Sequence, residues 1–123
     1  MNQSIYVVDD SEMMRVFIGR LCEKFGTVTQ FTSGEAVITA LSSGVIPNII
    51  ILDLNLPGIH GIEILKILQT NYSQFSIQTY VVSGVDNSQE KINCLSLGAK
   101  DFIVKPFHPK ELEYKIQSFS SNP

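Results

Sequence analysis

The chain contains little cysteine, with only Cys22 and Cys94 among its 123 residues. Both lie inside patterns typical of helices, and neither has a partner at the spacing of metal ligands. Isolated cysteines of this kind usually serve as small buried or half-buried apolar residues. We therefore expect neither a redox site nor a cysteine-bound metal.

Basic residues are also scarce. The chain has 9 Lys and Arg against 12 Asp and Glu, its formal net charge is -3, and no stretch concentrates the positive charge. Nucleic acids and anionic membranes attract concentrated positive charge. We therefore predict no direct nucleic-acid binding by this chain and no association with a membrane.

Long apolar runs are absent as well. The uninterrupted apolar stretches are far shorter than the roughly 20 residues that span a bilayer, and residues 1–4 show no signal-peptide pattern, so we expect a cytoplasmic protein. The sequence has no internal repeat or low-complexity segment. Residues 1–123 are predicted to form a single domain, with its core at about 3–119 and with 120–123 as a tail or the start of a linker.

The sequence does contain four short apolar runs rich in valine and isoleucine, each followed directly by reactive polar residues. The runs occupy residues 5–8, 49–52, 79–82 and 102–104. The polar residues that follow them are, in the same order, Asp9 with Asp10, Asp53, Ser83 and Lys105. Runs without polar alternation are typical of strands buried on both faces. If the strands are parallel, these polar residues meet at the edge where open parallel sheets bind ligands.

Segments with helical periodicity separate the strands, and capping residues mark their ends. The first is expected to begin at Ser11 and to end at Gly26, before a short strand at 28–31. Its apolar stripe contains Met14, Ile18, Leu21 and Phe25. Later helices are expected after Ser33, where Gly44 ends the helix, and after the loop that holds Gly61. The last begins at Pro109, with an apolar face of Leu112, Ile116 and Phe119.

The helix expected before the strand at 102–104 begins at Asn87. Glu90, three residues later, completes the pattern of a capping box, and Gly98 is expected to close the helix. Ile92 and Leu95 are the apolar positions along it, and the helix is polar along much of the rest of its length.

Strands and helices thus alternate five times. Connections of this length are crossovers, and right-handed crossovers place helices on both faces of a parallel sheet. We predict an α/β fold of the flavodoxin-like, doubly wound type, with a five-stranded parallel sheet in the order 2-1-3-4-5 and five helices. In this order the winding reverses between the first and third strands, which brings Asp9, Asp10 and Asp53 together.

Three aspartates at one edge need an explanation. A single aspartate before a helix would serve as a cap. A cluster of carboxylates should raise the pKa of each member unless a cation lies among them. Mg²⁺ prefers carboxylate oxygens, keeps several waters and is often completed by a phosphoryl oxygen, so we predict a magnesium site. No histidine or cysteine stands at an equivalent position, which disfavours zinc.

Lys105 and Ser83 extend this site. Taken alone, Lys105 could be a solvated lysine or a simple counterion, and Ser83 could be a loop residue. Beside a metal and Asp53, an ammonium and a hydroxyl together fit a phosphoryl group.

The combined pieces resemble the receiver domain of two-component response regulators, from residue 3 to about 119. The matching segments are residues 7–11, 51–61, 82–84 and 98–107, and together they are highly specific. The resemblance implies that Asp53 is the phosphoacceptor. It also implies that Asp10 and Asp53 bind Mg²⁺ directly, with Asp9 acting largely through water and the backbone carbonyl of Asn55 completing the protein ligands.

The same resemblance assigns roles beyond the metal. Ser83 would be the switch hydroxyl, Lys105 the counterion of the phosphoryl group and Phe102 an aromatic rotamer switch, with a cis bond between Lys105 and Pro106. Phe102 stands where many relatives have tyrosine, so a buried strand-end aromatic remains an equal interpretation. His60 and His108 match no chemical position, and we interpret them as a loop residue and a cap-region residue.

The predicted function is that of a phosphoacceptor rather than a turnover enzyme. A sensor histidine kinase or a phosphotransfer protein would donate a phosphoryl group to Asp53, and slow self-dephosphorylation would remove it. The helix at 87–98, the strand at 102–104 and the helix from 109 would then present an altered face. The expected partners of that face are an output protein, an effector domain or, in a phosphorylation-dependent homodimer, a second copy.

Three alternatives stay open. Residues 53–55 resemble the Asp-x-Asp of haloacid-dehalogenase-like phosphatases, although Asn55 cannot serve as a general acid. A flavodoxin-type flavin binder shares the topology, but Asp9 and Asp10 would repel its phosphate. A receiver that docks partners without phosphorylation is the third, and phosphate uptake at Asp53 separates it from the main prediction.

Overall fold

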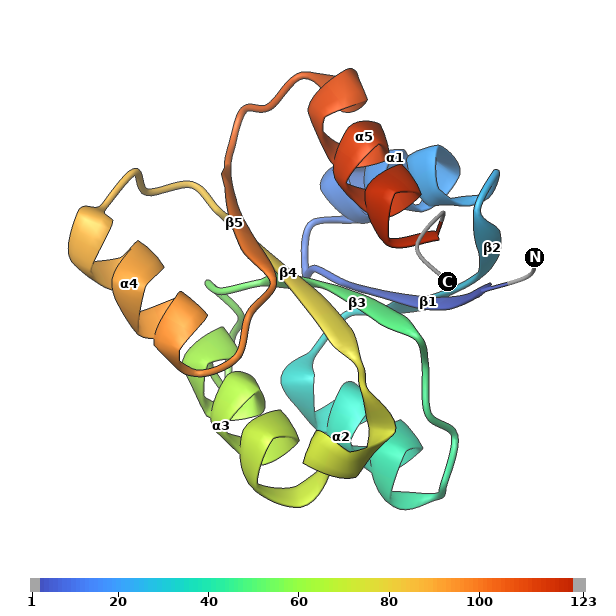
Figure 1. Cartoon of the computed structure of the whole chain (residues 1–123), viewed down its shortest axis with the longest axis vertical. Helices are drawn as coiled ribbons and strands as arrows, with labels where there is room; N and C mark the ends of the chain where they lie inside the picture. The colour runs from blue at the N-terminus through green and yellow to red at the C-terminus, as the bar shows by residue number, and fades with distance from the viewer. Residues whose placement is uncertain (1–2, 121–123) are drawn as a thin grey trace.

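The computed structural model describes residues 3–120, and the side chains of residues 3–118. Within this range a parallel sheet has five strands in the order β2-β1-β3-β4-β5 (Figure 1). The strands are β1 (Gln3–Val8), β2 (Gly26–Phe31), β3 (Ile49–Asp53), β4 (Gln78–Ser83) and β5 (Asp101–Val104). The predicted flavodoxin-like fold and strand order are confirmed.

Helices cover both faces of the sheet. They are α1 (Glu12–Cys22), α2 (Gly34–Ser42), α3 (Gly61–Asn71), α4 (Ser88–Ser96) and α5 (Pro109–Ser120), with a short 3-10 turn, η1 (Ser73–Phe75), that the sequence did not predict. Helices α1 and α5 lie on one face, and α2, α3 and α4 lie on the other (Figure 1). The chain therefore has the two-sided winding that the crossovers require.

Each face of the sheet has its own apolar core, because successive strand residues point to opposite sides. Tyr6 and Leu52 belong to the core under α2 and α3, whereas Val7 and Ile51 belong to the core under α1 and α5. Strand β3 is buried along its whole length. This explains why its sequence is an apolar run without alternation.

Side chains cap the helices much as predicted, and two histidines join them. Ser11 and Ser33 accept hydrogen bonds from backbone N–H groups in the first turns of α1 and α2. His60 Nδ1 accepts from the N–H of Ile62 at 3.1 Å, and His108 Nδ1 accepts from the N–H of Lys110 at 3.1 Å. His108 was predicted to lie near a cap, but the capping role of His60 was missed because histidine is an uncommon cap.

The predicted end of the first helix is wrong. Helix α1 ends at Cys22, Phe25 lies beyond it, and Gly26 is the first residue of β2. A Cβ at Gly26 would lie 2.0 Å from the carbonyl oxygen of Gln3, so the close pairing of β1 and β2 requires glycine there. In contrast, Gly44 and Gly98 follow α2 and α4 as predicted, with φ angles of +92° and +99°.

Helix α4 buries few apolar side chains. Ile92 is 58% exposed and Leu95 is 40% exposed. The residues of α4 that turn inward are Glu90, which is half-buried, and Cys94, which is fully buried. These two are four positions apart, which places them on one face of the helix. An inner face that begins with a carboxylate gave no apolar signal in the sequence.

The chain end departs slightly from the expectation. Ser120, which we expected in the tail, is the last residue of α5. The side chain of Phe119 and the expected tail residues 121–123 lie outside the described residues.

Among residues 3–120, none of the helices has the length and apolar character needed to cross a bilayer.

Candidate functional site

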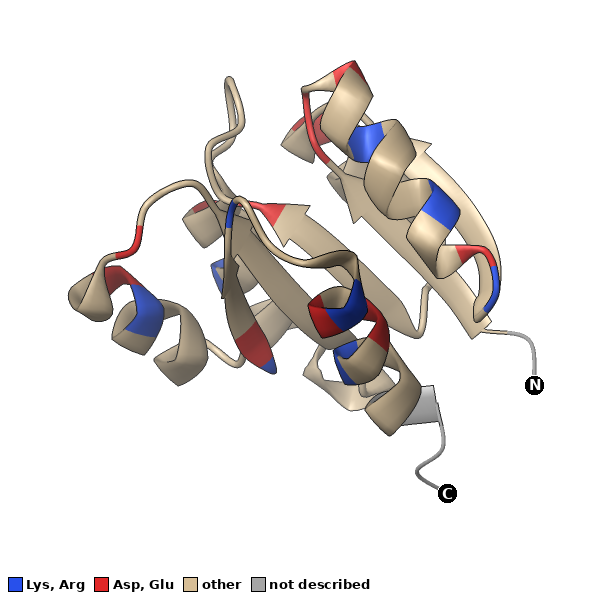
Figure 2. Cartoon of the chain, turned by 90° about the horizontal axis from the view of Figure 1, so that it is seen from above, with Lys and Arg blue, Asp and Glu red and all other residues tan. Residues whose placement is uncertain are grey.

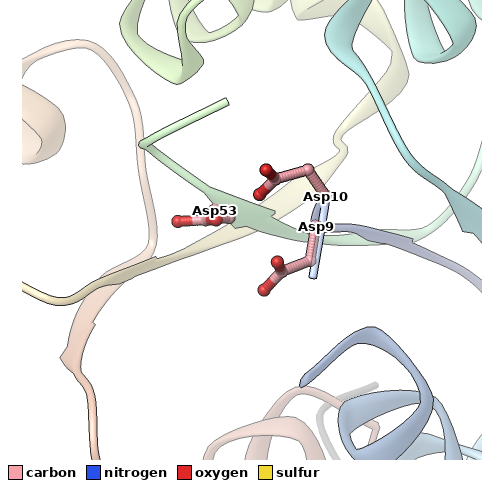
Figure 3. A group of neighbouring side chains, drawn as sticks. All are labelled: Asp9, Asp10 and Asp53. Carbon is pink, nitrogen blue, oxygen red and sulfur yellow. The ribbon is translucent and has the colours of Figure 1, made fainter. Parts of the chain in front are cut away.

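The polar residues that follow the apolar runs meet at one edge of the sheet. Asp53 is the last residue of β3, Asp9 directly follows β1, and Lys105 directly follows β5. Carboxylate oxygens of Asp9, Asp10 and Asp53 all lie within 4.8 Å of one another. Figure 3 shows the three side chains where β1 and β3 end. The predicted clustering of the aspartates is confirmed.

Asp9 is the most firmly held of the three. It is 1% exposed, its Oδ1 accepts from the N–H of Ser11 at 2.9 Å, and its Oδ2 accepts from Lys105 Nζ at 3.2 Å. Arg15 also donates to its backbone carbonyl at 3.1 Å. Asp10, by contrast, is exposed. Asp9 thus fixes the position of Lys105, while the Asp10 carboxylate faces solvent.

Asp53 lies between these two carboxylates and the lysine. It is 5% exposed, its Oδ1 accepts from the N–H of Asn55 at 3.2 Å, and Lys105 Nζ lies 3.5 Å from the same oxygen. Burial raises the pKa of Asp53, the ammonium of Lys105 opposes that rise, and the charge of Asp9 adds to it. The sequence predicted a raised pKa from charge repulsion, whereas removal from water is the larger cause.

Lys105 is held in place through its backbone as well as its side chain. The bond between Lys105 and Pro106 is cis, as predicted, and the N–H of Lys105 donates to the carbonyl of Ser83 at 2.7 Å. Its side chain is 20% exposed. One ammonium therefore faces the acidic cluster from the end of β5.

The donor set fits a divalent cation. Three carboxylates face a single ammonium, so the cluster keeps an excess of negative charge. Its donors are all oxygen, and one of its members, Asp10, is open to solvent, as a cation that keeps several waters requires. The carboxylates of Asp9, Asp10 and Asp53 therefore fit a metal ion, and Mg²⁺ as that ion stays a prediction. The backbone carbonyl of Asn55 as a further ligand stays a prediction.

Ser83 makes a contact that the sequence did not predict, and its role as the switch hydroxyl stays a prediction. It is fully buried at the end of β4, and its Oγ donates to Glu90 Oε1 at 3.1 Å and accepts from the N–H of Val85 at 3.1 Å. The sequence predicted Glu90 only as part of a capping box. Its contact with Ser83 was missed because it depends on how α4 lies against β4.

Phe102 is buried in β5, with 6% of its surface exposed, and belongs to the core under α2 and α3. This placement agrees with a buried strand-end aromatic. Its action as a rotamer switch stays a prediction.

Comparisons with known proteins agree with this site. The family model described as "Response regulator receiver domain" matches residues 5–117. The chain is 34% identical over 115 residues to the transcriptional regulatory protein FixJ of Bradyrhizobium diazoefficiens, an alignment that covers 93% of this chain and 55% of FixJ. It is 32% identical over 120 residues to the alkaline phosphatase synthesis transcriptional regulatory protein PhoP of Bacillus subtilis, covering 96% of this chain and 48% of PhoP.

The chain thus spans about half the length of the curated relatives it matches.

Among solved structures, the BeF3-activated DrrB receiver domain is similar in fold, with a TM-score of 0.89, 23% identity, and coverage of 99% of this chain and 100% of that one. The receiver domain of the Francisella response regulator 1452 has a TM-score of 0.85 and 25% identity, with 97% of both chains covered. With its fold, its acidic site and the matching family model, this chain belongs to the receiver domains of two-component response regulators.

Proposed function

We propose that this receiver domain accepts a phosphoryl group on Asp53 from a phosphohistidine of a sensor histidine kinase or a phosphotransfer protein. The observation that carries the proposal is the setting of the Asp53 carboxylate. It is 5% exposed, it lies among the carboxylates of Asp9 and Asp10, and Lys105 Nζ is 3.5 Å away. Phosphoryl transfer depends mainly on positioning and on neutralisation of charge, which such a setting can supply.

The proposed transfer exchanges one bond for another at phosphorus. An oxygen of Asp53 bonds to phosphorus while the bond from phosphorus to the donor imidazole breaks, and the imidazole keeps the electron pair. Mg²⁺ bound by Asp10, Asp53 and the Asn55 carbonyl, with Asp9 acting through water, would supply positive charge to the phosphoryl oxygens. Lys105 brings a second positive charge on a side chain that Asp9 already orients.

Loss of the phosphoryl group is proposed to occur by slow hydrolysis of the acyl phosphate. A haloacid-dehalogenase-like phosphatase needs an acid to protonate its leaving group. The residue at the corresponding position is Asn55, whose amide cannot serve as that acid. We therefore propose a phosphoacceptor with self-dephosphorylation, acting in the cytoplasm, rather than a turnover enzyme.

Signalling is proposed to run from Ser83 and Phe102 to a face formed by α4, β5 and α5. On this output face Ile92 and Leu95 expose apolar surface on α4, and Tyr114 on α5 is 71% exposed. Apolar side chains beside charged ones favour a protein partner. Because the longer relatives named above are transcriptional regulators, we propose that the partner is an effector domain, a separate output protein or a second copy.

Acidic and basic segments are interspersed along the helices in Figure 2 rather than gathered on one element. This distribution supports recognition through a partner and not through direct nucleic-acid binding by this chain.

Sedimentation with and without beryllofluoride, which mimics a bound phosphoryl group, tests self-association. Lys91→Glu is the better probe of the face, since Lys115 pairs with Asp101 and its reversal would disturb β5 as well.

Phosphate uptake tests the central proposal. Intact-mass measurement after treatment with acetyl phosphate should find one phosphate with Mg²⁺, none with a chelator, and none in Asp53→Asn. Asp86→Asn, which changes an exposed aspartate outside the cluster, is the matched control and should be modified like the wild type. Full modification of Asp53→Asn would place the phosphoacceptor elsewhere, and a wild type that takes no phosphate would favour a docking module that works without phosphorylation.

A further inference from the structure

We infer that Glu90 is a positioning residue that holds the hydroxyl proton of Ser83 in the unphosphorylated chain and so opposes activation. The inference rests on the proposed function, because it concerns the regulation of the same site. Its basis is the hydrogen bond from Ser83 Oγ to Glu90 Oε1, which joins the end of β4 to the first turn of α4 over 3.1 Å.

The Glu90 carboxylate lies on the inner side of its helix. Asn87 Oδ1 accepts from the N–H of Glu90 at 2.9 Å, which is half of a capping box. The carboxylate that would complete the box extends instead to the fully buried Ser83. Burial and then the charge of Glu90 raise the pKa of Cys94, one turn further along, to about 11. A carboxylate that affects a buried thiol and bonds a buried hydroxyl is not a solvated surface group.

Ser83 has only one proton to give. A hydroxyl has one donor and two lone pairs, and one lone pair of Ser83 Oγ already accepts from the N–H of Val85. The carbonyl of Val85 is a second acceptor for the proton, but at 3.4 Å it is farther than Glu90. Phosphoryl oxygens act as acceptors, so a phosphoryl group on Asp53 can engage Ser83 only by taking the same proton. Glu90 and the phosphoryl group therefore compete for it.

This competition links the phosphorylation site to α4. When Ser83 turns to a phosphoryl oxygen, Glu90 loses its contact with β4, and Cys94 is left as the buried residue within α4. In the reverse direction, the Glu90 contact favours the unphosphorylated arrangement of Ser83. A contact shifts the equilibrium between the inactive and active arrangements only if its free energy differs between them. The hydrogen bond between Ser83 and Glu90 exists only in the inactive arrangement, so it favours that arrangement.

The affinity for beryllofluoride in the presence of Mg²⁺, followed by amide NMR, measures how much the contact between Ser83 and Glu90 favours the inactive arrangement. Glu90→Ala should bind beryllofluoride roughly tenfold more tightly than the wild type, as expected for loss of a charge-assisted hydrogen bond from the inactive state. The affinity of Glu90→Gln should lie between those of the wild type and Glu90→Ala, because its amide oxygen still accepts a hydrogen bond but carries no charge. Glu111→Ala removes a carboxylate from the same third position of α5 and should leave the affinity unchanged.

A double-mutant cycle separates this role from a general effect on α4. In a Ser83→Ala background no hydroxyl proton remains to compete for, so adding Glu90→Ala should no longer tighten binding. An equal gain with and without Ser83, or no gain in Glu90→Ala, would overturn the inference while leaving the proposed function intact. If the wild type binds no beryllofluoride at all, the proposed function fails, and the inference fails with it.

Discussion

Helices α4 and α5 cover opposite faces of the sheet beside β5, yet they are held in different ways (Figure 1). Helix α5 buries Leu112 and Ile116 completely. Helix α4 buries only Cys94 completely and adds the hydrogen bond between Glu90 and Ser83. Apolar burial on α5 is therefore replaced on α4 by one thiol and one polar contact.

The comparison indicates where a signal can move the domain. Burial of a leucine or isoleucine side chain stabilises by about 1.5–3 kcal/mol and is insensitive to events at the site. A hydrogen bond to a charged group contributes a similar amount only while both partners keep their geometry. The helix tied to the site by such a contact, α4, is the one that a phosphoryl group on Asp53 can release.

The largest expected effect tests the difference in anchoring directly. Leu112→Ala should lower the free energy of unfolding by about 2–5 kcal/mol, since it leaves a cavity under α5. Cys94→Ala, which removes one sulfur under α4, should cost about 1 kcal/mol. Urea denaturation of both variants measures the two values. Equal losses would mean that α4 is anchored as firmly as α5 and would break the comparison.

Asp53→Asn should raise the free energy of unfolding at neutral pH in the presence of a chelator. Burial raises the pKa of Asp53 above its ordinary value of 3.8, so between these two pKa values the folded chain binds more protons than the unfolded chain. As pH rises from the ordinary pKa of Asp53 to its raised pKa in the folded chain, this carboxyl group lowers the free energy of unfolding. At neutral pH the loss is complete, because the buried group is then ionised.

The pH dependence of this gain is the decisive measurement. The advantage of Asp53→Asn should shrink as pH falls towards the ordinary carboxyl pKa, while the cost of Leu112→Ala, an apolar loss, should stay constant. Asp86→Asn, which changes an exposed aspartate outside the cluster, is the matched control. If Asp53→Asn proved less stable than the wild type at neutral pH, its carboxylate would be a net stabilising group.

The fold was predictable because its signals are local. The buried runs before Asp9 and Asp53 have no polar alternation, and the caps Ser11 and Asn87 act on N–H groups a few residues away. The gathering of the aspartates followed from topology, since every parallel strand ends at the same edge. The matching motifs then gave the roles assigned to Ser83 and Lys105, which remain predictions.

The failures concern tertiary contacts. Gly26 starts a strand rather than ending a helix, because the backbone of Gln3 approaches it closely. Glu90 was predicted only as part of a capping box, yet it begins the inner face of α4 while Ile92 and Leu95 are exposed. A carboxylate that turns inward to meet a buried hydroxyl has the same local sequence as a capping box that faces solvent. Only the placement of α4 against β4 distinguishes them.

Loss of a helix cap should have different consequences on the two helices. Asn87→Ala and His108→Ala each remove a side-chain acceptor from a first turn, at a cost of about 1 kcal/mol. Because α4 has little buried surface, Asn87→Ala should mainly speed amide hydrogen exchange within α4. His108→Ala should act on global stability, because α5 opens only with the core. Selective fast exchange in α5 after His108→Ala would contradict this view.

The smallest expected effect concerns the ion pair between Lys115 of α5 and Asp101 of β5. Both side chains are partly exposed, at 24% and 34%, and such pairs typically contribute about 0.2–1 kcal/mol. Burial acts to raise the pKa of Asp101, but hydrogen bonds from Lys115 and from the N–H of Phe102 outweigh it and lower the pKa overall. Stability from a lowered pKa is present above the ordinary carboxyl pKa and is lost as pH falls through the folded value.

Lys115→Met keeps much of the apolar stem of this side chain and removes the ammonium. It should lower the free energy of unfolding slightly at neutral pH, and the difference from the wild type should vanish in acid, where Asp101 is protonated. Lys66→Met is the matched control, because the ion pair between Lys66 and Glu63 is more exposed and spans a single turn of α3. A loss at Lys115 that persists unchanged in acid would show that α5 is attached there by packing alone, with no contribution from charge.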